Sequence, residues 1–479
     1  MHRRLFIGQA GMLGIGAVIS PNILKAAKID LPVVRVPKSE RKFNSDGIEK
    51  LILNIRKQVK DPQLGWLFEN CFPNTLDTTV DFSINNGKPD TYVITGDIDA
   101  MWLRDSSAQV WPYLPFMKED KKLQQLIAGV IRRQTQCILL DPYANAFYKD
   151  FSKISEWKDD LTEMKPGIHE RKWEVDSLCY TIRLAYGYWK QTGDTSVFDN
   201  EWKHAMLLIV KTFKEQQRLE GKGPYHFQRK TSWATDGVPM GGFGYPTKKI
   251  GLIHSMFRPS DDATVYPFLI PSNVFAFYSL QQLTAIFMEI QYNEPMNDCL
   301  TLMDQLLGAI LQHGIINHPQ YGKIFAYEVD GFGNYSIMDD ANIPSTLSLK
   351  YLAGDVGSPL AYNAPNFTTV YGNSRKIVLS NSNPFFFKGN AAEGIGGPHV
   401  GMDYIWPTSV IMRAMTSAVD AEIKQCLQWL KSTHAETGFM HESFHKDDPT
   451  KFTRKWFAWA NTLFGELLLK IVKERPHLV

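Results

Sequence analysis

Residues 93–112 read VITGDIDAMWLRDSSAQVWP, a stretch in which a polar loop leads into a mostly apolar helix. Gly and Asp favour turns over regular structure, so we expect 96–99 to form a loop. From Met101 onward, apolar residues recur at spacings that fit one face of a helix. Such a junction presents free N–H groups and flexible acceptors to a ligand. We therefore expect the fold to present polar loops from a helical scaffold.

The side chains of this stretch suit a ligand that is rich in hydroxyl groups. The carboxylates of Asp97, Asp99 and Asp105 and the guanidinium of Arg104 can bracket pairs of hydroxyls. The indole of Trp102 can stack on the C–H face of a sugar. The structural alternative is a buried pair of Arg104 with Asp105 or Asp99 that only fixes the start of the helix.

The overall composition excludes some classes of protein. A net charge of +2 over 479 residues gives no electrostatic footprint for a nucleic acid, so we expect no nucleic-acid partner. A hydrophobic content of 44% is ample for a sizeable core, and the 12% of aromatic residues could also serve a carbohydrate cleft. The cysteines lack metal-ligand spacing, and we expect all of them in the core: Cys71, Cys137, Cys179, Cys299 and Cys426.

The N-terminus predicts an export signal of the twin-arginine type. Arg3 and Arg4 precede a modest apolar run over 8–19, which is too short to anchor the chain in a membrane. An ordinary signal peptide with two chance arginines is the alternative. We expect an exported, periplasmic protein without a stable membrane anchor. Its expected parts are a signal over 1–27, a linker over 28–44 and a single catalytic domain over 45–479.

Pairs of long helices alternate with polar loops along the rest of the chain. Helical spacing predicts helices over 45–60, 121–140, 170–192, 196–219, 271–291, 293–313, 341–352, 358–362, 405–418, 421–432 and 455–472, with a short strand over 78–85. An alternating βα pattern is absent, which argues against a TIM barrel or a doubly wound sheet. No fixed-period repeat supports an α-solenoid. We predict an all-α (α/α)6 toroid with long loops and minor β elements, whose active site lies where the loops at one end converge.

Cleavage of a glycosidic bond needs two carboxyl groups on opposite faces of that bond. Asp261 and Asp262 lie in an irregular region before a helix, and paired like charges raise one pKa, as a general acid requires. The alternative is that Ser260 and these aspartates only cap the helix.

Glu442 is the second candidate, in a loop after Gly438 and between His441 and His445. Two histidines and a glutamate could suggest zinc, but a second ligand cluster is missing, so we expect no metal. A general base is the better use of Glu442. Other loop residues could line the pocket, cap helices or belong to the core: Asp339, Asp340, His399 and Trp406.

Four stretches resemble, in the same order, the motifs of glycoside hydrolase family 125. They are GDIDAMWLRDS from Gly96, FRPSDD from Phe257, MDDAN from Met338 and GFMHE from Gly438. The family comprises bacterial and fungal exo-acting α-mannosidases. The resemblance implies an (α/α)6 barrel and hydrolysis of α-1,6-linked mannose from the non-reducing end of a glycan. It also implies inversion at the anomeric carbon, with no metal or other cofactor. Asp99 stands where we expect the family to have Pro.

The resemblance also implies roles for single residues. The RPSDD motif places the general acid at Asp261, with Asp262 as the fallback, and the MHE motif places the general base at Glu442. The residues expected to hold the terminal mannose are Asp97, Asp99, Trp102, Arg104, Asp105, Arg258, Asp339, Asp340, His399, Trp406 and His441. The expected partner is a mannose-containing glycan, and the sequence is silent on the oligomeric state.

Two other classes of protein remain open. One is a catalytically inactive protein that binds mannosides. The other is a metal-dependent sugar transferase that would use Asp97 and Asp99 as a metal-binding pair, although the sequence shows no nucleotide site.

Overall fold

The computed structural model describes residues 31–353 and 367–479, and the part from Val33 to Val479 forms one compact unit. The export signal expected over 1–27 and the short helix expected over 358–362 lie outside the described residues.

The stretch expected to be a linker is tied to the domain over its described residues. Arg35 donates hydrogen bonds to Asp77 and to Glu49, each at 2.6 Å, and its side chain is only 8% exposed. Residues 33–44 therefore belong to the compact unit.

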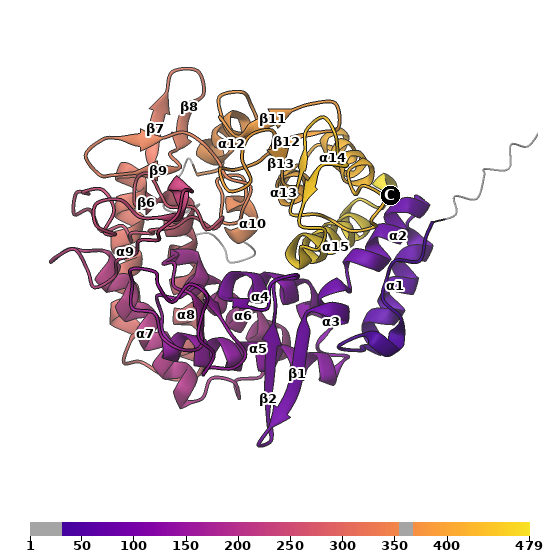
Figure 1. Cartoon of the computed structure of the whole chain (residues 1–479), viewed down its shortest axis with the longest axis horizontal. Coiled ribbons are helices and arrows are strands. Elements are labelled where there is room, and N and C mark those ends of the chain that lie inside the picture. The colour runs from indigo at the N-terminus through magenta and orange to yellow at the C-terminus, as the bar shows by residue number, and fades with distance from the viewer. Residues whose placement is uncertain (1–30, 354–366) are drawn as a thin grey trace, which may run out of the picture. The chain divides into compact units, whose positions relative to one another are not determined.

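Among the described residues, six helices form an inner ring in which each packs against the next (Figure 1). They are α4 (Leu103–Val110), α6 (Val175–Thr192), α8 (Ile270–Glu289), α10 (Leu349–Ala353), α13 (Pro407–Thr416) and α15 (Ala458–Glu474). Contacts between α15 and α4 close the ring, so the last helix of the chain lies beside the first helix of the ring.

A second set of helices packs around this ring (Figure 1). It contains α2 (Pro62–Cys71), α5 (Lys121–Leu140), α7 (Asn200–Gln216), α9 (Met296–His313), α12 (Phe367–Val378) and α14 (Asp420–Ser432), with α1 (Asp46–Gln58) and α3 (Asn74–Thr78) beside α2 and α15. Residue patterns explain the two layers, because α8 is buried on all sides whereas α9 buries a stripe from Cys299 to Ile310. The predicted (α/α)6 toroid is confirmed.

The helices of the two layers begin in different ways. In the outer layer, Asp61, Asp120 and Asp199 cap α2, α5 and α7 with their side chains. In the inner ring, the residues before α4, α13 and α15 are Trp102, Trp406 and Phe457, which give no side-chain cap. The first N–H groups of these inner helices are therefore left without a capping side chain.

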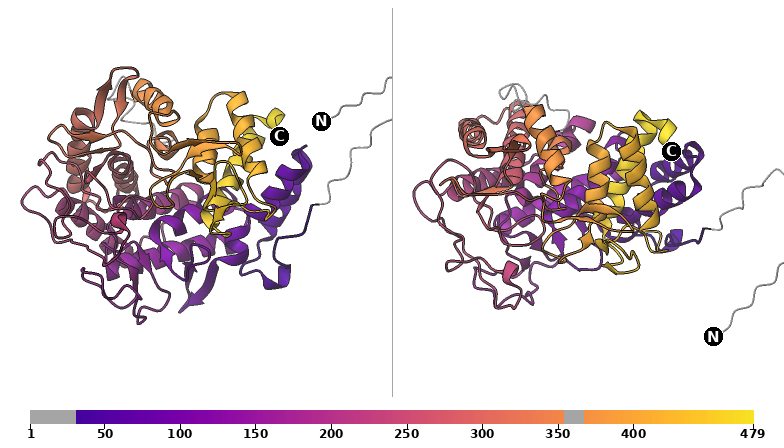
Figure 2. Two further views of the ribbon diagram at one scale, coloured as in Figure 1. Left: turned by 45° about the horizontal axis from the view of Figure 1, so that its top comes forward. Right: turned by 90° about the horizontal axis from the view of Figure 1, so that it is seen from above.

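Small antiparallel sheets order the segments that lead into the inner helices. The strands are β1 (Val80–Asn85), β2 (Lys88–Val93), β3 (Met101–Trp102), β4 (Ala146–Phe147), β5 (Ile168–Glu170), β6 (Phe268–Leu269), β7 (Ile315–His318), β8 (Gly322–Phe325), β9 (Glu328–Val329), β10 (Tyr335–Ser336), β11 (Phe386–Lys388), β12 (Glu393–Ile395), β13 (Tyr404–Ile405), β14 (Ser443–His445) and β15 (Phe452–Thr453). In the sheet β3-β4-β5, Ala146 pairs with both Trp102 and Glu170, which aligns the loops before α4 and α6. Side views show the irregular segments gathered along one side of the helices (Figure 2).

Some helix boundaries differ from the prediction. Helix α6 begins at Val175, so the residues from Glu170 to Glu174, expected to be helical, form an extended segment instead. Helix α10 begins at Leu349 rather than at 341, because the preceding residues form a polar loop. The proposed capping of α8 by Ser260 and its neighbours is wrong, since that helix begins only at Ile270.

All five cysteines are buried and free, as predicted. Within the described ranges, no helix is both long enough and apolar enough to cross a membrane.

The packing of α15 against the end of α2 can be tested with a glycine. A methyl group at Gly465 would lie 2.8 Å from Phe72 Cβ and 3.0 Å from Phe72 Cα, which is closer than packed atoms allow. We expect Gly465→Ala to destabilise the protein by about 1–3 kcal/mol and to lower its thermal midpoint. Gly308→Ala in α9 is the control, because that position has open space and alanine is the better helix former. A midpoint that is unchanged by Gly465→Ala would contradict this packing.

Candidate active site

The loops that precede the inner helices enclose one cavity of about 560 Å³. Its volume lies within the range of about 300–1,000 Å³ that is usual for small-molecule sites. Eight residues singled out in the sequence line it: Trp102, Arg104, Asp105, Asp261, Asp262, His399, Trp406 and Glu442. The loops thus converge at one end, as the helical pattern predicted.

A tight turn presents Asp261 and Asp262 to the cavity. Pro259 suits the second position of a β-turn, in which the N–H of Asp261 donates to the carbonyl of Arg258 at 2.9 Å. The N–H of Arg258 in turn donates to the carbonyl of Asp262 at 2.7 Å. Asp261 has a φ of 67°, in the left-handed region that Asp tolerates better than most residues.

Arg104 is the centre of a buried charge cluster beside this turn. It donates to Glu174 Oε2 at 2.6 Å, to Asp176 Oδ2 at 3.1 Å and to Asp261 Oδ1 at 3.3 Å. The side chain of Arg104 is only 3% exposed, and its Nε lies 3.7 Å from Asp105 Oδ2. Arg104 therefore forms the buried ion pairs of the structural alternative and also lines the cavity.

The surroundings of the two aspartates in the turn shift their pKa values in opposite directions. Burial alone would raise the pKa of Asp261, but Arg104 and Lys172 outweigh it and hold that pKa well below its ordinary value. Burial raises the pKa of Asp262 above its ordinary value, and the Asp340 carboxyl group acts in the same direction. Asp262 is therefore the member of the pair that carries a proton more readily.

Ser260 and His399 surround the carboxyl group of Asp262. Ser260 Oγ lies 3.1 Å from Asp262 Oδ2 and 2.7 Å from Asp340 Oδ2, and its single proton can serve one of them at a time. His399 Nδ1 lies 3.9 Å from Asp262 Oδ2. Asp340, which we expected to hold the sugar, therefore acts behind Ser260 and does not itself line the cavity.

Glu442 reaches the cavity from the segment that leads into β14. Its carboxyl group accepts a hydrogen bond from Arg454 Nη1 at 3.3 Å. Asp97 holds Arg454 in place, with Nε at 2.8 Å and Nη2 at 2.5 Å from Asp97 Oδ1. Asp97 therefore orients a neighbour of Glu442 and is not part of the cavity lining.

Several aromatic side chains in the lining are buried. Trp102, Trp406 and Trp459 are 7%, 2% and 2% exposed. Among the described residues, the indole N–H groups of Trp102 and Trp406 have no hydrogen-bond partner. Buried donors are normally satisfied, so these two offer hydrogen bonds to the oxygens of a bound ligand.

Two polar residues expected to bind sugar have other partners and lie outside the lining. The side chain of Asp99 is 77% exposed and lies 3.5 Å from Lys153. Arg258 is buried, and its Nε donates to Glu328 Oε1 at 2.7 Å. The geometry gives Arg258 a structural role beneath the turn.

Asp339 and His441 are likewise outside the cavity lining. Asp339 accepts the backbone N–H groups of Thr346 at 2.7 Å and Leu347 at 3.0 Å, and burial raises its pKa to about 7. His441 is stacked on Phe452 with ring centroids 3.8 Å apart, and burial lowers its pKa to about 4. Both side chains therefore support loops beside the cavity.

Several charged residues of the site escaped the sequence analysis. The segment before α6 was predicted to be helical, which hid the role of Lys172 and Glu174. The Nζ of Lys172 lies 3.0 Å from the carbonyl of Asp261 and 2.5 Å from Asp236 Oδ1. The run ERKWE from Glu170, with its dense charge ahead of an apolar helix, is the signal that could have found them. The charged lining residues missed are Glu156, Glu170, Lys172, Arg229, Asp236 and Arg454, and the tryptophans Trp157 and Trp233 were missed as well.

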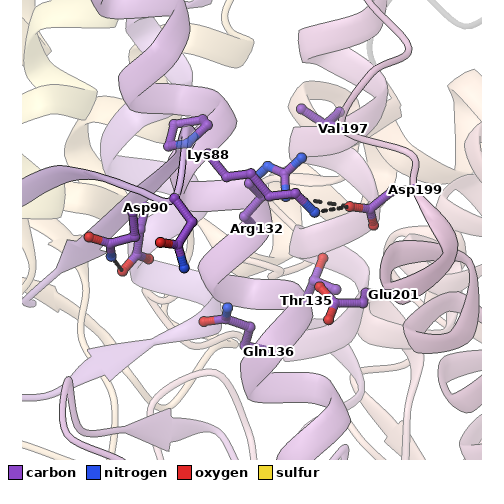
Figure 3. A pocket seen from close by; sticks show the side chains of 11 residues that line it. Lys88, Asp90, Arg132, Thr135, Gln136, Val197, Asp199 and Glu201 are labelled. Atoms are coloured by element: carbon purple, nitrogen blue, oxygen red, sulfur yellow. Dashed lines mark hydrogen bonds and ion pairs between the residues drawn. The ribbon is translucent and has the colours of Figure 1, made fainter.

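A second cavity, of about 360 Å³, lies between the β1–β2 hairpin, α5 and the start of α7 (Figure 3). Lys88 and Arg132 both point toward Asp199, each at 3.4 Å from its Oδ2 (Figure 3). Asp90 is paired with Arg133. Four of the five charged residues in this lining are thus paired within the protein, and Glu201 is the fifth.

A metal-binding role for the first loop has no support in the geometry. The carboxyl groups of Asp97 and Asp99 face Arg454 and Lys153. Within the described ranges, no group of three or more His, Cys, Asp or Glu residues is placed to hold a metal ion.

Comparison with known proteins agrees with this geometry. Residues 61–469 match the family described as metal-independent α-mannosidase (GH125). A solved Streptococcus pneumoniae metal-independent α-mannosidase, in a non-productive substrate complex with α-1,6-mannobiose, is 39% identical with a TM-score of 0.83, over 91% of this chain and 100% of that one. The Meiotically up-regulated gene 157 protein of Schizosaccharomyces pombe is 39% identical over 467 residues, 94% of this chain and 90% of that protein. A solved glycosidase with 11% identity and a TM-score of 0.51, over 85% of this chain and 96% of that one, shares the fold alone. The chain belongs to glycoside hydrolase family 125, the metal-independent α-mannosidases.

Proposed function

We propose that the protein removes terminal α-1,6-linked mannose from the non-reducing end of glycans and inverts the anomeric centre. The observation that carries this proposal is the meeting of the Asp261–Asp262 turn and Glu442 in one cavity. Two carboxyl groups from separate loops are what single displacement at a glycosidic bond needs. The mannobiose bound by the Streptococcus pneumoniae relative supports the choice of linkage.

The depth of the cavity supports exo-action. Arg104 and Trp459, which line it, are 3% and 2% exposed, so buried side chains close this part of the cavity. A cavity closed on one side favours the end of a glycan chain over its middle. The terminal mannose would lie against Trp102 and Trp406, whose indole N–H groups can donate to its hydroxyls.

We assign the general acid to Asp262 rather than to Asp261, the residue expected from the sequence. A general acid must hold a proton before the reaction, and burial favours the protonated form of Asp262. Arg104 and Lys172 favour the ionised form of Asp261. Asp262 donates its proton to the glycosidic oxygen as the bond breaks, while Asp261 keeps Arg104 and the turn in place.

Glu442 acts as the general base in this scheme. It removes a proton from the water that attacks the anomeric carbon from the face opposite the leaving oxygen. Arg454 lies 3.3 Å from Glu442 and orients the carboxyl group. The two catalytic carboxyl groups of an inverting enzyme are expected to lie about 6.5–9.5 Å apart, which leaves room for this water.

The product of α-1,6-mannobiose tests the reaction directly. Because single displacement inverts the anomeric centre, we expect proton NMR to show β-mannose first, before mutarotation forms the α anomer. Release of α-mannose first would contradict inversion. Binding of mannobiose without release of mannose on long incubation would support the alternative of an inactive mannoside-binding protein.

Leaving-group chemistry tests the choice of acid. We expect Asp262→Asn to lower kcat on α-1,6-mannobiose by about 10²–10⁴, yet to keep the rate on α-mannosyl fluoride within roughly ten-fold, because fluoride needs little protonation to leave. Asp261→Asn is the matched control and should affect the two substrates alike. The assignment of Asp262 as the acid is wrong if Asp261→Asn, and not Asp262→Asn, keeps the rate on α-mannosyl fluoride.

The environment of Glu442 gives a graded test. We expect Glu442→Gln to lower kcat by about 10²–10⁴ on both substrates, because the attacking water loses its base. Asp97→Asn should cost less, roughly 10- to 100-fold, because it only misplaces Arg454. Asp99→Asn should be close to wild type, since its carboxyl group is 77% exposed and lies outside the cavity lining. Equal losses for Asp97→Asn and Asp99→Asn would contradict the role given to Arg454.

A further inference from the structure

Two tryptophans line the cavity yet remain open to solvent. Trp157 is 36% exposed and Trp233 is 51% exposed, whereas Trp102 and Trp406 in the same lining are 7% and 2% exposed. This difference places Trp157 and Trp233 at the mouth of the cavity and the other two at its inner end. Large apolar surfaces in contact with water at the edge of a pocket are typical of a binding surface.

Buried groups hold Trp157 in place. The Arg229 guanidinium lies over its ring, 3.8 Å from the centroid, and Arg229 is itself bound to Asp160 at 2.7 Å. The backbone N–H of Trp157 donates to Ser155 Oγ at 3.0 Å, and that hydroxyl donates to the carbonyl of His169 at 2.6 Å. With one face of the indole against Arg229, its other face is the one that can meet a ligand.

The turn that carries Asp261 and Asp262 is called the acid turn here. Trp233 is connected to it through its own short helix, η3 (Ala234–Asp236). The backbone N–H of Asp236 donates to the carbonyl of Trp233 at 3.0 Å, and Asp236 pairs with Lys172 at 2.5 Å. The carbonyl of Thr235 accepts the N–H of Ala263, the residue after Asp262, at 2.7 Å. The position of Trp233 is thus fixed relative to the general acid.

We propose that Trp157 and Trp233 form the subsite for the sugar on the leaving-group side of the scissile bond. The inference rests on the proposed function. If the terminal mannose occupies the inner end of the cavity, the sugar behind it must lie at the mouth, where these two rings are. Their flat apolar surfaces suit the C–H face of a pyranose, so they select a sugar as the leaving group.

Comparison of two substrates tests this subsite. We expect Trp157→Ala and Trp233→Ala to lower kcat/KM for α-1,6-mannobiose by about 10- to 100-fold, the loss usual for a central aromatic contact. The rate on α-mannosyl fluoride, which has no leaving sugar, should be unchanged. Trp157→Phe, which keeps a ring over Arg229, should retain most of the activity on mannobiose.

Phe332→Ala is the matched control, because Phe332 is 64% exposed and lies outside the cavity lining. This variant should have the wild-type rates on both mannobiose and α-mannosyl fluoride. Equal losses on mannobiose and fluoride for the tryptophan variants would overturn the subsite, since the rings would then serve the terminal sugar or the fold. Unchanged kinetics on mannobiose would overturn it as well.

A binding measurement separates this inference from the proposed function. In the Glu442→Gln background, calorimetry should show that each tryptophan-to-alanine change weakens the binding of mannobiose by about 10- to 100-fold. The affinity for methyl α-mannoside should be unaffected. This result would support the subsite even if the wild-type enzyme released no mannose, an outcome that would overturn the proposed function alone. Equal weakening of both ligands would overturn the subsite.

Discussion

The buried guanidinium of Arg104 is the constraint on which the site depends. Burial alone would lower its pKa, but Glu174, Asp176 and Asp261 more than compensate and keep it well above its ordinary value. A charge taken out of water is tolerated only when partners surround it, and loss of one partner from such a pair costs about 3–5 kcal/mol. Because these partners come from the start of α6 and from the turn of Asp261 and Asp262, one side chain joins α4 to two segments that are distant in the sequence.

Adjacent residues of this site have opposite environments, and this division supports the proposed chemistry. In the acid turn, Asp261 faces Arg104 while Asp262 faces Ser260 and a second carboxyl group. In the first loop, Asp97 binds Arg454, whereas Asp99 extends into solvent. Neighbours in the chain can therefore take a proton-donating role and a positioning role, as paired carboxyl groups in different surroundings do in glycosidases generally.

The sequence predicted much of the fold because helical periodicity and helix ends are local signals. The range predicted for α5 agrees with the structure at both ends, and the helix predicted from residue 45 begins with Ser45 as its cap. Pairing across the ring is not a local signal, so the contact between Asp97 and Arg454 could not be read from either segment. The apolar spacing continued through Glu174, which hid the partner of Arg104 inside a predicted helix. The export signal stays a prediction from the sequence.

The inner helices that begin after Trp102, Trp406 and Phe457 give the cavity an electric field as well as a shape. Each helix start carries about half a positive charge, and here no side chain of the capping residue offsets it. Glycosidases pass through a positively charged, oxocarbenium-like sugar, which such a field opposes. The carboxyl groups around Arg104 oppose the positive field of these helix starts. The carboxyl groups beyond the two that exchange protons then have a role in this architecture, because their negative charge offsets the positive helix ends that face a cationic transition state.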